Sequence, residues 1–442
     1  MSEDDGAGRG PITSRSSSRP PAPRPPEPRA PGPRTGGPRR DDRTTGRDSG
    51  DRGQNPGAGD REPGRDSSDR ARWGAVLTAR QVALDALTRI EQEGAYANLV
   101  VPNLVGALSD PRDRALVTEL VYGTTRMRRA LDLATDRYLV REPPPELRTL
   151  LRLGTYQIGY TDIPPHAAVS ETVGLAPQRL RGVVNAVLRK VATGGEPVWP
   201  DDATRLSYPD WLVERFVAEL GRVDALAALT RMNDAPPVTM RDDGYVQDRS
   251  SQWVAELVDA QPGDVIVDLC AAPGGKSTAM AGPGIMVVAA DVRPHRSQLV
   301  ADNVRRLGLR DEVAVVIADG LATPLRPGSA DRVLLDAPCS GLGALRRRPD
   351  ARWRIQPSDI QELAGVQGRL LAAARELVRP GGTLVYSVCT VTAAETIDLD
   401  DGSWPALDAP GAPWRPVGRG ARVLPQDEDT DGMTILRWRR PD

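Results

Sequence analysis

The pattern of apolar and polar positions divides the chain into parts of different character. Residues 1–72 are Pro, Gly, Ser, Arg and Asp with almost no large apolar side chain. Such a segment cannot bury enough surface to offset the entropy lost on ordering. We therefore expect a disordered Pro/Arg/Gly-rich tail. Its arginines could attract RNA weakly, but the interleaved acidic residues favour a solubilising extension.

Apolar residues recur at helical spacing over residues 73–193, for example in ARQVALDALTRI, ALVTELVYGTTRMRRALDLA and RLRGVVNAVLRKVA. The proline clusters EPPPE and DIPPH separate these stretches, as prolines do at helix ends. The pattern predicts an all-α domain. Residues 200–245 form a shorter segment, in which YPDWLVERFVAELG predicts an amphipathic helix and PPVTMR a short strand.

From residue 246 to residue 442 the spacing of apolar residues changes. Strand-like runs alternate with helical stretches such as PSDIQELAGVQGRLLAAARELV; the runs are VIVDLC, MVVAADV, VAVVIAD, RVLLDAP and TLVYSVC. This alternation predicts an α/β domain with a mainly parallel sheet. We therefore expect a tail, a helical domain, a small α+β linker subdomain and an α/β domain.

Composition narrows the functional classes. The chain has 442 residues and a net charge of -2, with 58 Lys plus Arg, of which only Lys190 and Lys276 are lysines. Its three cysteines have no paired spacing, which argues against a disulfide framework and against a zinc site. No apolar run is long enough for a membrane span, and no secretory signal is visible. We expect a soluble cytoplasmic protein without a metal.

The segment VIVDLCAAPGGKS predicts a strand, a glycine-rich turn and a helix, which is a geometry used for nucleotides. It lacks the G-x-G-x-x-G pattern, and Cys270 stands where a Walker A motif needs its first glycine. An ordinary strand–turn–helix connection explains poorly why Asp268, Pro273 and the scarce Lys276 coincide here.

Acidic residues close the next three predicted strands: Asp291, Asp319 and Asp336. Parallel strands end at one edge of a sheet, where ligands of α/β proteins bind. A carboxylate at the position of Asp291 can accept hydrogen bonds from both ribose hydroxyls. Any one of these aspartates alone would be unremarkable in a loop, and it is the series that indicates a nucleotide-like ligand.

Three motifs together, DLCAAPGGKS, LLDAPCSGLGALRRRPDARW and YSVCT, resemble the Sun/Fmu (NOP2/Sun) family of S-adenosylmethionine-dependent RNA cytosine-5 methyltransferases. The segments ELVYGTTRMRRALD, LLRLGTYQIGY and VVNAVLRKV resemble NusB-like RNA-binding domains. The combination resembles the ribosomal-RNA branch of the family and covers about residues 75–440. It implies a class I, Rossmann-like methyltransferase fold, S-adenosylmethionine as cofactor and RNA as partner. We also expect a monomer.

The resemblance also implies site residues. In the family the glycine-rich turn holds the cofactor, the counterpart of Asp291 binds its ribose, that of Asp319 lies near its adenine, and Asp336 sits on the substrate side. The implied cofactor residues are Cys270, Ala271, Ala272, Pro273, Gly274, Gly275, Lys276, Asp291, Asp319 and Asp336.

Two further cysteines follow predicted strands, Cys339 after LLDAP and Cys389 after YSV. Carbon 5 of cytosine is a weak nucleophile until a thiolate adds to carbon 6, so the chemistry needs an activated cysteine. Asp336 could hydrogen-bond the ring and stabilise charge during this addition. The residues do not reveal which cysteine attacks. The resemblance assigns attack to Cys389 and breakdown of the adduct to Cys339, whereas Cys270 fits an inert buried cysteine.

The run RRRPDARWR is a candidate phosphate-binding surface, and the alternative is a solvated charged loop. Its candidate RNA-binding residues are Arg346, Arg347, Arg348 and Arg354, with Arg352 in the same run. The sequence departs from the family after TVTAAET, where residues 396–420 are turn-rich. Met433 and Thr434 stand where aromatics are usual, which affects the rim of the substrate pocket.

Several functions remain open at this point. A non-catalytic RNA-binding or ribosome assembly factor could keep the same fold, but intact Cys339, Cys389 and Asp336 favour an enzyme. Transfer RNA is an alternative substrate to ribosomal RNA. Protein or DNA as substrate is disfavoured by the RNA-binding-like helical domain.

Overall fold

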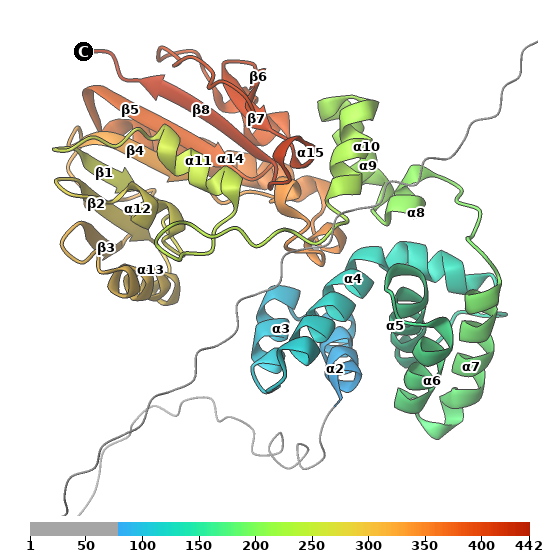
Figure 1. The fold of residues 1–442 in the computed structure, drawn as a ribbon. Coiled ribbons are helices and arrows are strands. Elements are labelled where there is room, and N and C mark those ends of the chain that lie inside the picture. The colour runs from blue at the N-terminus through green and yellow to red at the C-terminus, as the bar shows by residue number, and fades with distance from the viewer. Residues whose placement is uncertain (1–77) are drawn as a thin grey trace, which may run out of the picture. The chain divides into compact units, whose positions relative to one another are not determined.

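The computed structural model describes residues 78–442, so the predicted tail lies outside the described residues. The helical domain is confirmed, with six helices in its described part (Figure 1). They are α2 (Ala79–Gln92), α3 (Ala97–Val105), α4 (Pro111–Asp136), α5 (Pro145–Tyr160), α6 (Pro165–Leu175) and α7 (Gln178–Thr193). Prolines occupy the first turn of α4, α5 and α6, where the missing N–H costs no hydrogen bond.

Helices α4 and α5 approach closely in this domain. A Cβ atom at Gly123 would lie 1.9 Å from the ring of Tyr156, so only glycine leaves room for that ring. The packed interior consists of fully buried leucines, among them Leu87, Leu120 and Leu153. The apolar stripe seen in the sequence is thus the face along which the helices pack.

The linker segment contains α8 (Asp202–Leu206), α9 (Asp210–Leu220) and α10 (Arg222–Arg231), which confirms the amphipathic helix. The predicted strand in PPVTMR is wrong, because Met240 makes only an isolated bridge with Val246. Two consecutive prolines lack the N–H groups that a ladder requires. The helices share a core with Leu342 and Val391, two residues of the α/β domain.

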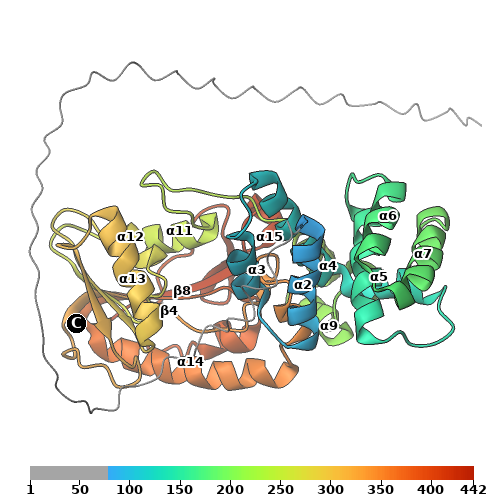
Figure 2. The same cartoon turned by 90° about the horizontal axis from the view of Figure 1, so that it is seen from below.

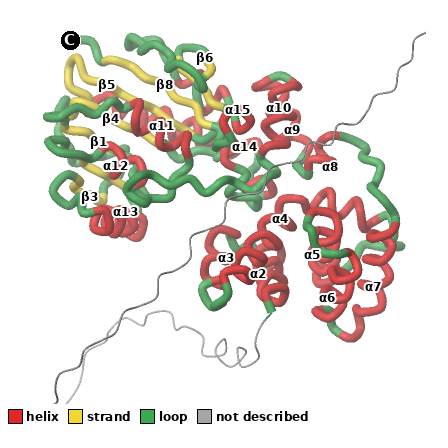
Figure 3. Tube along the Cα trace, in the orientation of Figure 1, coloured by secondary structure: helices red, strands yellow, loops and turns green. Residues whose placement is uncertain are grey.

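The α/β domain contains one sheet, whose strands are yellow in Figure 3, and its strand order is β3-β2-β1-β4-β5-β8-β7-β6 (Figure 1). Its strands are β1 (Val265–Asp268), β2 (Met286–Asp291), β3 (Val313–Ile317), β4 (Ala330–Asp336), β5 (Val378–Val388), β6 (Arg415–Val417), β7 (Gly420–Val423) and β8 (Met433–Arg439). Strands β1 to β5 pair in parallel, as predicted, whereas β8, β7 and β6 add an antiparallel extension.

Helices cover both faces of the sheet. Helices α11 (Arg249–Leu257), α12 (Gly275–Met280) and α13 (Pro294–Leu307) lie on one side, and α14 (Pro357–Leu377) lies on the other (Figure 2). Adjacent strand residues alternate between the two cores, so that Ile266 and Leu334 face α11 and α13 while Val267 and Val333 face α14. Because β1, β2, β4 and β5 run parallel, their carboxyl ends meet at one edge of the sheet.

The segment after β5 is irregular, as expected. It consists of the short 3-10 turns Ala393–Glu395 and Ile397–Leu399 and a loop that leads to β6, and α15 (Pro425–Glu428) precedes β8. Within residues 78–442, no helix has the length and apolarity needed to cross a bilayer. The same residues contain no group of three or more His, Cys, Asp or Glu side chains arranged to hold a metal ion.

Candidate active site

The turn after β1 carries a buried carboxylate. Asp268 is 1% exposed, and the hydroxyl of Ser277 donates to its Oδ2 atom at 2.7 Å. Its Oδ1 atom finds no hydrogen-bond partner among the described residues. Burial raises the pKa of Asp268 to about 7. Gly274 takes a φ of 99°, which bends the chain into α12.

A cavity of about 160 Å³ opens beside this turn. Sequence reasoning anticipated part of its lining, namely Cys270, Ala271, Ala272, Pro273, Gly275, Lys276 and Asp336. It missed Tyr245, Val246, Gln247 and Ser251 and noted Asp268 without assigning it to the site. The polar segment VQDRSSQ, which leads into the first turn of α11, was the available signal, but only the fold brings it to the edge of the sheet. Carboxylates at this cavity suit a cationic ligand such as a sulfonium or an ammonium group.

Lys276 and Asp336 form an ion pair at the cavity. The Lys276 Nζ atom lies 2.7 Å from Asp336 Oδ2, and the hydroxyl of Ser387 donates to Asp336 Oδ1 at 2.8 Å. The Lys276 side chain is only 11% exposed. The turn after β1 is thereby joined to the ends of β4 and β5.

The sulfur atoms of Cys339 and Cys389 lie 3.4 Å apart. In the parallel pairing of β4 with β5, Asp336 faces Ser387; Cys339 follows the end of β4 by three residues, and Cys389 directly follows β5. Both cysteines are half-buried. The structure thus brings together two side chains that are 50 residues apart in the sequence.

The two thiols differ in their electrostatic surroundings. A hydrogen bond from the Cys339 thiol lowers the pKa of Cys389, although burial alone would raise it. The nearby charge of Lys276 also lowers this pKa. The hydrogen bond with Cys389 and burial hold the pKa of Cys339 well above its usual range, and the Glu395 carboxylate adds to this. Cys389 is therefore the better thiolate and Cys339 the better hydrogen-bond donor. Burial also raises the pKa of Cys270 to about 12, which fits an inert cysteine.

Backbone contacts hold the cysteine loops close together. The Gly343 N–H donates to the Cys389 carbonyl oxygen at 2.9 Å, and the Gly432 N–H donates to the Gly343 carbonyl oxygen at 2.9 Å. A Cβ atom at Gly343 would lie 2.2 Å from the Gly432 carbonyl oxygen, so this crossing requires glycine.

The two remaining acids lie along the same edge but outside the lining of this cavity. Asp291 is 4% exposed; its Oδ1 accepts from the Arg293 N–H at 3.0 Å, and Arg296 lies 3.7 Å from its Oδ2. Asp319 is exposed and accepts from the Leu321 N–H at 2.9 Å. Asp291 ends β2, the strand next to β1 and its glycine-rich turn, whereas Asp319 follows β3, one strand farther along the sheet.

The arginine run has internal partners that the sequence did not reveal. Arg346 is 1% exposed and pairs with Asp429 at 2.7 Å, and Arg347 bridges Asp248 and Asp431. Arg346 is therefore shielded from phosphates, and Arg347 has its charge matched by two carboxylates.

Two other arginines of the run, Arg352 and Arg354, donate to backbone oxygens. Arg354 donates to the carbonyl oxygen of Gly94 at 2.7 Å, and fully buried Arg352 lies 3.9 Å from the ring centroid of Tyr208. Arg348 is exposed. The run is therefore neither a phosphate surface formed by all its arginines nor a solvated loop. Most of its side chains make contacts between the α/β domain and the helices.

Met433 and Thr434 lie on β8, and both are buried. The Thr434 hydroxyl donates to the Thr390 carbonyl oxygen at 2.8 Å, next to Cys389, and accepts from Arg422 Nε at 3.2 Å. A small polar side chain thus supports the Cys389 loop where an aromatic ring was expected.

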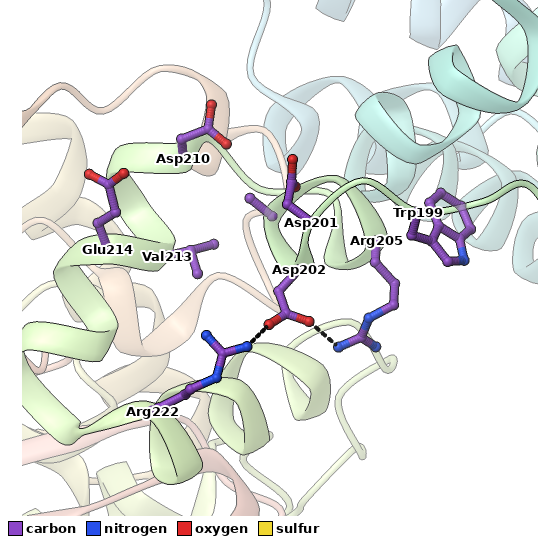
Figure 4. Close-up of a pocket in the computed structure, with 9 residues that line it drawn as sticks. Trp199, Asp201, Asp202, Arg205, Asp210, Val213, Glu214 and Arg222 are labelled. Atoms are coloured by element: carbon purple, nitrogen blue, oxygen red, sulfur yellow. Dashed lines mark hydrogen bonds and ion pairs between the residues drawn. The ribbon is translucent and has the colours of Figure 1, made fainter. Parts of the chain in front are cut away.

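A larger cavity of about 520 Å³ lies at the linker helices (Figure 4). Four carboxylates line it, those of Asp201, Asp202, Asp210 and Glu214, and Asp202 pairs with Arg205 and Arg222. Its acidic lining opposes phosphate binding, and neither cysteine borders it. The smaller cavity at the edge of the sheet is therefore the candidate active site.

Comparisons with known families agree with this location. Residues 255–401 match the sequence profile described as 16S rRNA methyltransferase RsmB/F, and residues 77–193 match that of the NusB family. The first match contains the glycine-rich turn, both cysteines and all the strand-end acids.

Curated relatives extend the match over most of the chain. The Mycobacterium tuberculosis protein named "Putative methyltransferase Rv1407" is 38% identical, over 72% of this chain and 85% of the relative. The ribosomal RNA small subunit methyltransferase B of Cronobacter sakazakii is 31% identical, over 81% of this chain and 97% of the relative. That of an Enterobacter species is 34% identical, over 80% and 97%.

A solved structure matches the fold. The crystal structure of PH0851 superposes with a TM-score of 0.65 at 21% identity, covering 80% of this chain and 96% of that one. At this identity the likeness supports the architecture alone.

Proposed function

The chain belongs to the RsmB/F family of S-adenosylmethionine-dependent 16S rRNA methyltransferases, and from this premise we propose that it methylates carbon 5 of a cytosine in small-subunit ribosomal RNA. The observation that carries the proposal is the 3.4 Å contact between Cys339 and Cys389. Two adjacent cysteines with unlike environments suit a reaction in which one sulfur bonds to the base and the other assists its release.

We assign the cofactor to the edge of the sheet around the glycine-rich turn. S-adenosylmethionine, when bound, supplies an electrophilic methyl group on a sulfonium. The residues proposed to hold it are the segment 270–276, Asp291, Asp319 and Asp336, to which the cavity adds Asp268 and Gln247. The unpartnered Oδ1 atom of Asp268 supports this assignment, because a buried acceptor calls for a donor.

In the proposed mechanism, the Cys389 thiolate adds to carbon 6 of the cytosine and forms a sulfur–carbon bond. Electron density moves to carbon 5, which becomes nucleophilic. The Asp336 carboxyl group, placed by Lys276 and Ser387, hydrogen-bonds the ring during this addition. After methyl transfer, carbon 5 loses its proton, the electron pair re-forms the double bond, and the Cys389 sulfur leaves.

We assign this second half to Cys339. Its raised pKa keeps it protonated before the reaction, so it can donate a hydrogen bond to the Cys389 thiolate. As the adduct breaks down, its thiol stabilises the departing Cys389 sulfur by donating a hydrogen bond, and the carbon-5 proton passes to a water molecule, because a protonated thiol cannot accept it. The substrate base must be unstacked, because carbon 6 is inaccessible in a stacked helix.

Two cysteine variants test the mechanism. With Cys389→Ala we expect no methylation and no covalent complex. With Cys339→Ala we expect an RNA–protein complex that survives denaturing gels, and adding Cys389→Ala should abolish it. A complex with Cys389→Ala and none with Cys339→Ala would reverse the two roles.

Bisulfite sequencing of RNA from a deletion strain tests the substrate. One cytosine of small-subunit ribosomal RNA should lose its protection from deamination and regain it on complementation. Loss of protection in a transfer RNA alone would replace the proposed substrate. Unchanged protection throughout the RNA would favour a non-catalytic assembly factor.

A further inference from the structure

The carboxylate of Glu395 is buried beside both cysteine loops. Glu395 is 0% exposed and accepts five hydrogen bonds. Its Oε1 atom accepts from the Ser340 N–H at 2.7 Å and from Gln367 Nε2 at 3.1 Å. Its Oε2 atom accepts from the hydroxyls of Ser340, Thr392 and Thr390 at 2.5, 2.8 and 3.1 Å.

These donors come from both cysteine loops. Ser340 directly follows Cys339, and Thr390 directly follows Cys389. The Ser340 and Thr390 hydroxyls also lie 2.9 Å from each other. One carboxylate therefore joins the residue after each cysteine, because its Oε2 atom accepts hydrogen bonds from both loops.

A third element strengthens this link. Gln367 on α14 donates to the Pro338 carbonyl oxygen at 2.8 Å as well as to Glu395. The Cys339 loop is thus held on both sides of the cysteine. Burying a carboxylate is costly unless hydrogen bonds replace water, and here five of them do.

We propose that Glu395 is a positioning residue that holds the Cys339 and Cys389 loops together so that the two sulfur atoms remain in contact. This inference rests on the proposed function in one respect: it takes from it the roles of Cys389 as the thiolate and Cys339 as the hydrogen-bond donor. The thiol–thiolate contact is the property that Glu395 maintains, and that contact can be measured without RNA.

The pH dependence of Cys389 alkylation by iodoacetamide, read by peptide mass spectrometry, tests the proposal. Glu395→Ala releases the loops, so Cys389 loses its hydrogen bond from Cys339 and its alkylation curve moves to higher pH. We expect alkylation at neutral pH to slow by about tenfold, which corresponds to one pKa unit. Cys339→Ala removes the donor itself and should produce the same shift.

Matched variants separate position from charge. In Glu395→Gln the remaining oxygen can still accept from the Ser340 N–H and from Gln367, while the new amide faces three hydroxyls that can rotate to accept. We expect its alkylation rate to stay within about twofold of wild type. Glu362→Ala, an exposed change on α14, should alter nothing.

The direction of the shift decides between explanations. Loss of a negative charge alone would lower a nearby thiol pKa, so a curve displaced to lower pH in both Glu395 variants would overturn the positioning role. An unchanged curve in Glu395→Ala would overturn it as well. If Glu395→Ala does not fold, Thr390→Val removes one donor and should slow alkylation by about threefold; no change would count against the proposal.

Methylation kinetics provide a second readout. If the wild type methylates cytosine, Glu395→Ala should lower kcat by about 100-fold with KM for S-adenosylmethionine within about twofold, because only the sulfur placement is lost. If the wild type does not methylate cytosine, the proposed function fails, and the alkylation curves still decide the role of Glu395.

Discussion

The Nζ atom of Lys276 lies 2.7 Å from Oδ2 of Asp336, which joins the glycine-rich turn after β1 to the end of β4. Although burial disfavours its charge, Asp336 holds the pKa of Lys276 above its ordinary value. One of the only two lysines of the chain therefore carries a fixed positive charge between the glycine-rich turn and the Cys389 loop.

Replacing this lysine should affect the chemical step. In Lys276→Met, Asp336 keeps only its hydrogen bond from Ser387, and Cys389 loses a nearby positive charge that lowers its pKa. We expect kcat to fall by about 100-fold at neutral pH and to recover in part at higher pH, as the thiolate forms without assistance. A kcat profile parallel to that of the wild type would contradict this role.

Asp268 should make cofactor affinity depend on pH. Its folded-state pKa of about 7 lies above its ordinary value of 3.8, so the protonated form favours the folded chain and this stabilisation is lost as pH rises through 7. A cationic ligand favours the carboxylate and releases the proton. Affinity for S-adenosylmethionine should therefore rise about tenfold from pH 6 to pH 8.

Calorimetry in buffers of different ionisation enthalpy measures this proton release. Asp268→Asn should abolish the proton release that comes from the protein and make the affinity independent of pH between about 6 and 8. Any proton release that remains in this variant comes from the amino group of the ligand. Equal proton release by the wild type and the variant would exclude Asp268 as the titrating group.

Asp291 should contribute more to cofactor affinity than Asp319. Asp291 is buried at the end of β2, whereas Asp319 is exposed. Loss of hydrogen bonds to a charged acceptor costs about 1.5–3 kcal/mol, so Asp291→Ala should lower the binding affinity for S-adenosylmethionine by about 10- to 150-fold. Asp319→Ala serves as the milder comparison. Equal affinities of the Asp291 variant and the wild type would argue against a ribose contact.

Arg346 should act through stability. Arg346→Leu removes the ion pair with Asp429 and hydrogen bonds to the carbonyl oxygens of Thr430 and Ala235. Since Asp429 remains partly solvated, we expect a loss of about 2 kcal/mol in the free energy of unfolding. Chemical denaturation measures it, and a variant as stable as the wild type would contradict the structural role.

Arg348 should act on RNA instead. It is exposed, so Arg348→Ala should change stability by less than about 0.5 kcal/mol. RNA affinity should fall, and the slope of log affinity against log salt should decrease by about 0.7–0.9, because one phosphate contact releases fewer counterions. An unchanged slope would show that Arg348 is only solvated.

Local sequence patterns were sufficient to locate most helices, the parallel strands and the motifs at their ends. Helical periodicity and proline positions located α2 to α7, and five apolar runs located β1 to β5, because such patterns reflect which face of an element is buried. The antiparallel strands β6 to β8 were not anticipated, since their pairing with β5 depends on contacts between distant segments. The strand expected in PPVTMR failed because it has no adjacent ladder partner.

The sequence by itself determined that two cysteines, a scarce lysine and a series of aspartates would gather at the ends of parallel strands. Only the tertiary structure decided their contacts: the β4–β5 register brings Cys339 against Cys389, and the crossing of loops buries Glu395 between them. It also decided that Arg346 lies in the interior and Arg348 at the surface, although the sequence pattern does not distinguish these two arginines of one run. A pattern reports which residues accompany a strand end, whereas burial and pairing depend on neighbours supplied by remote parts of the chain.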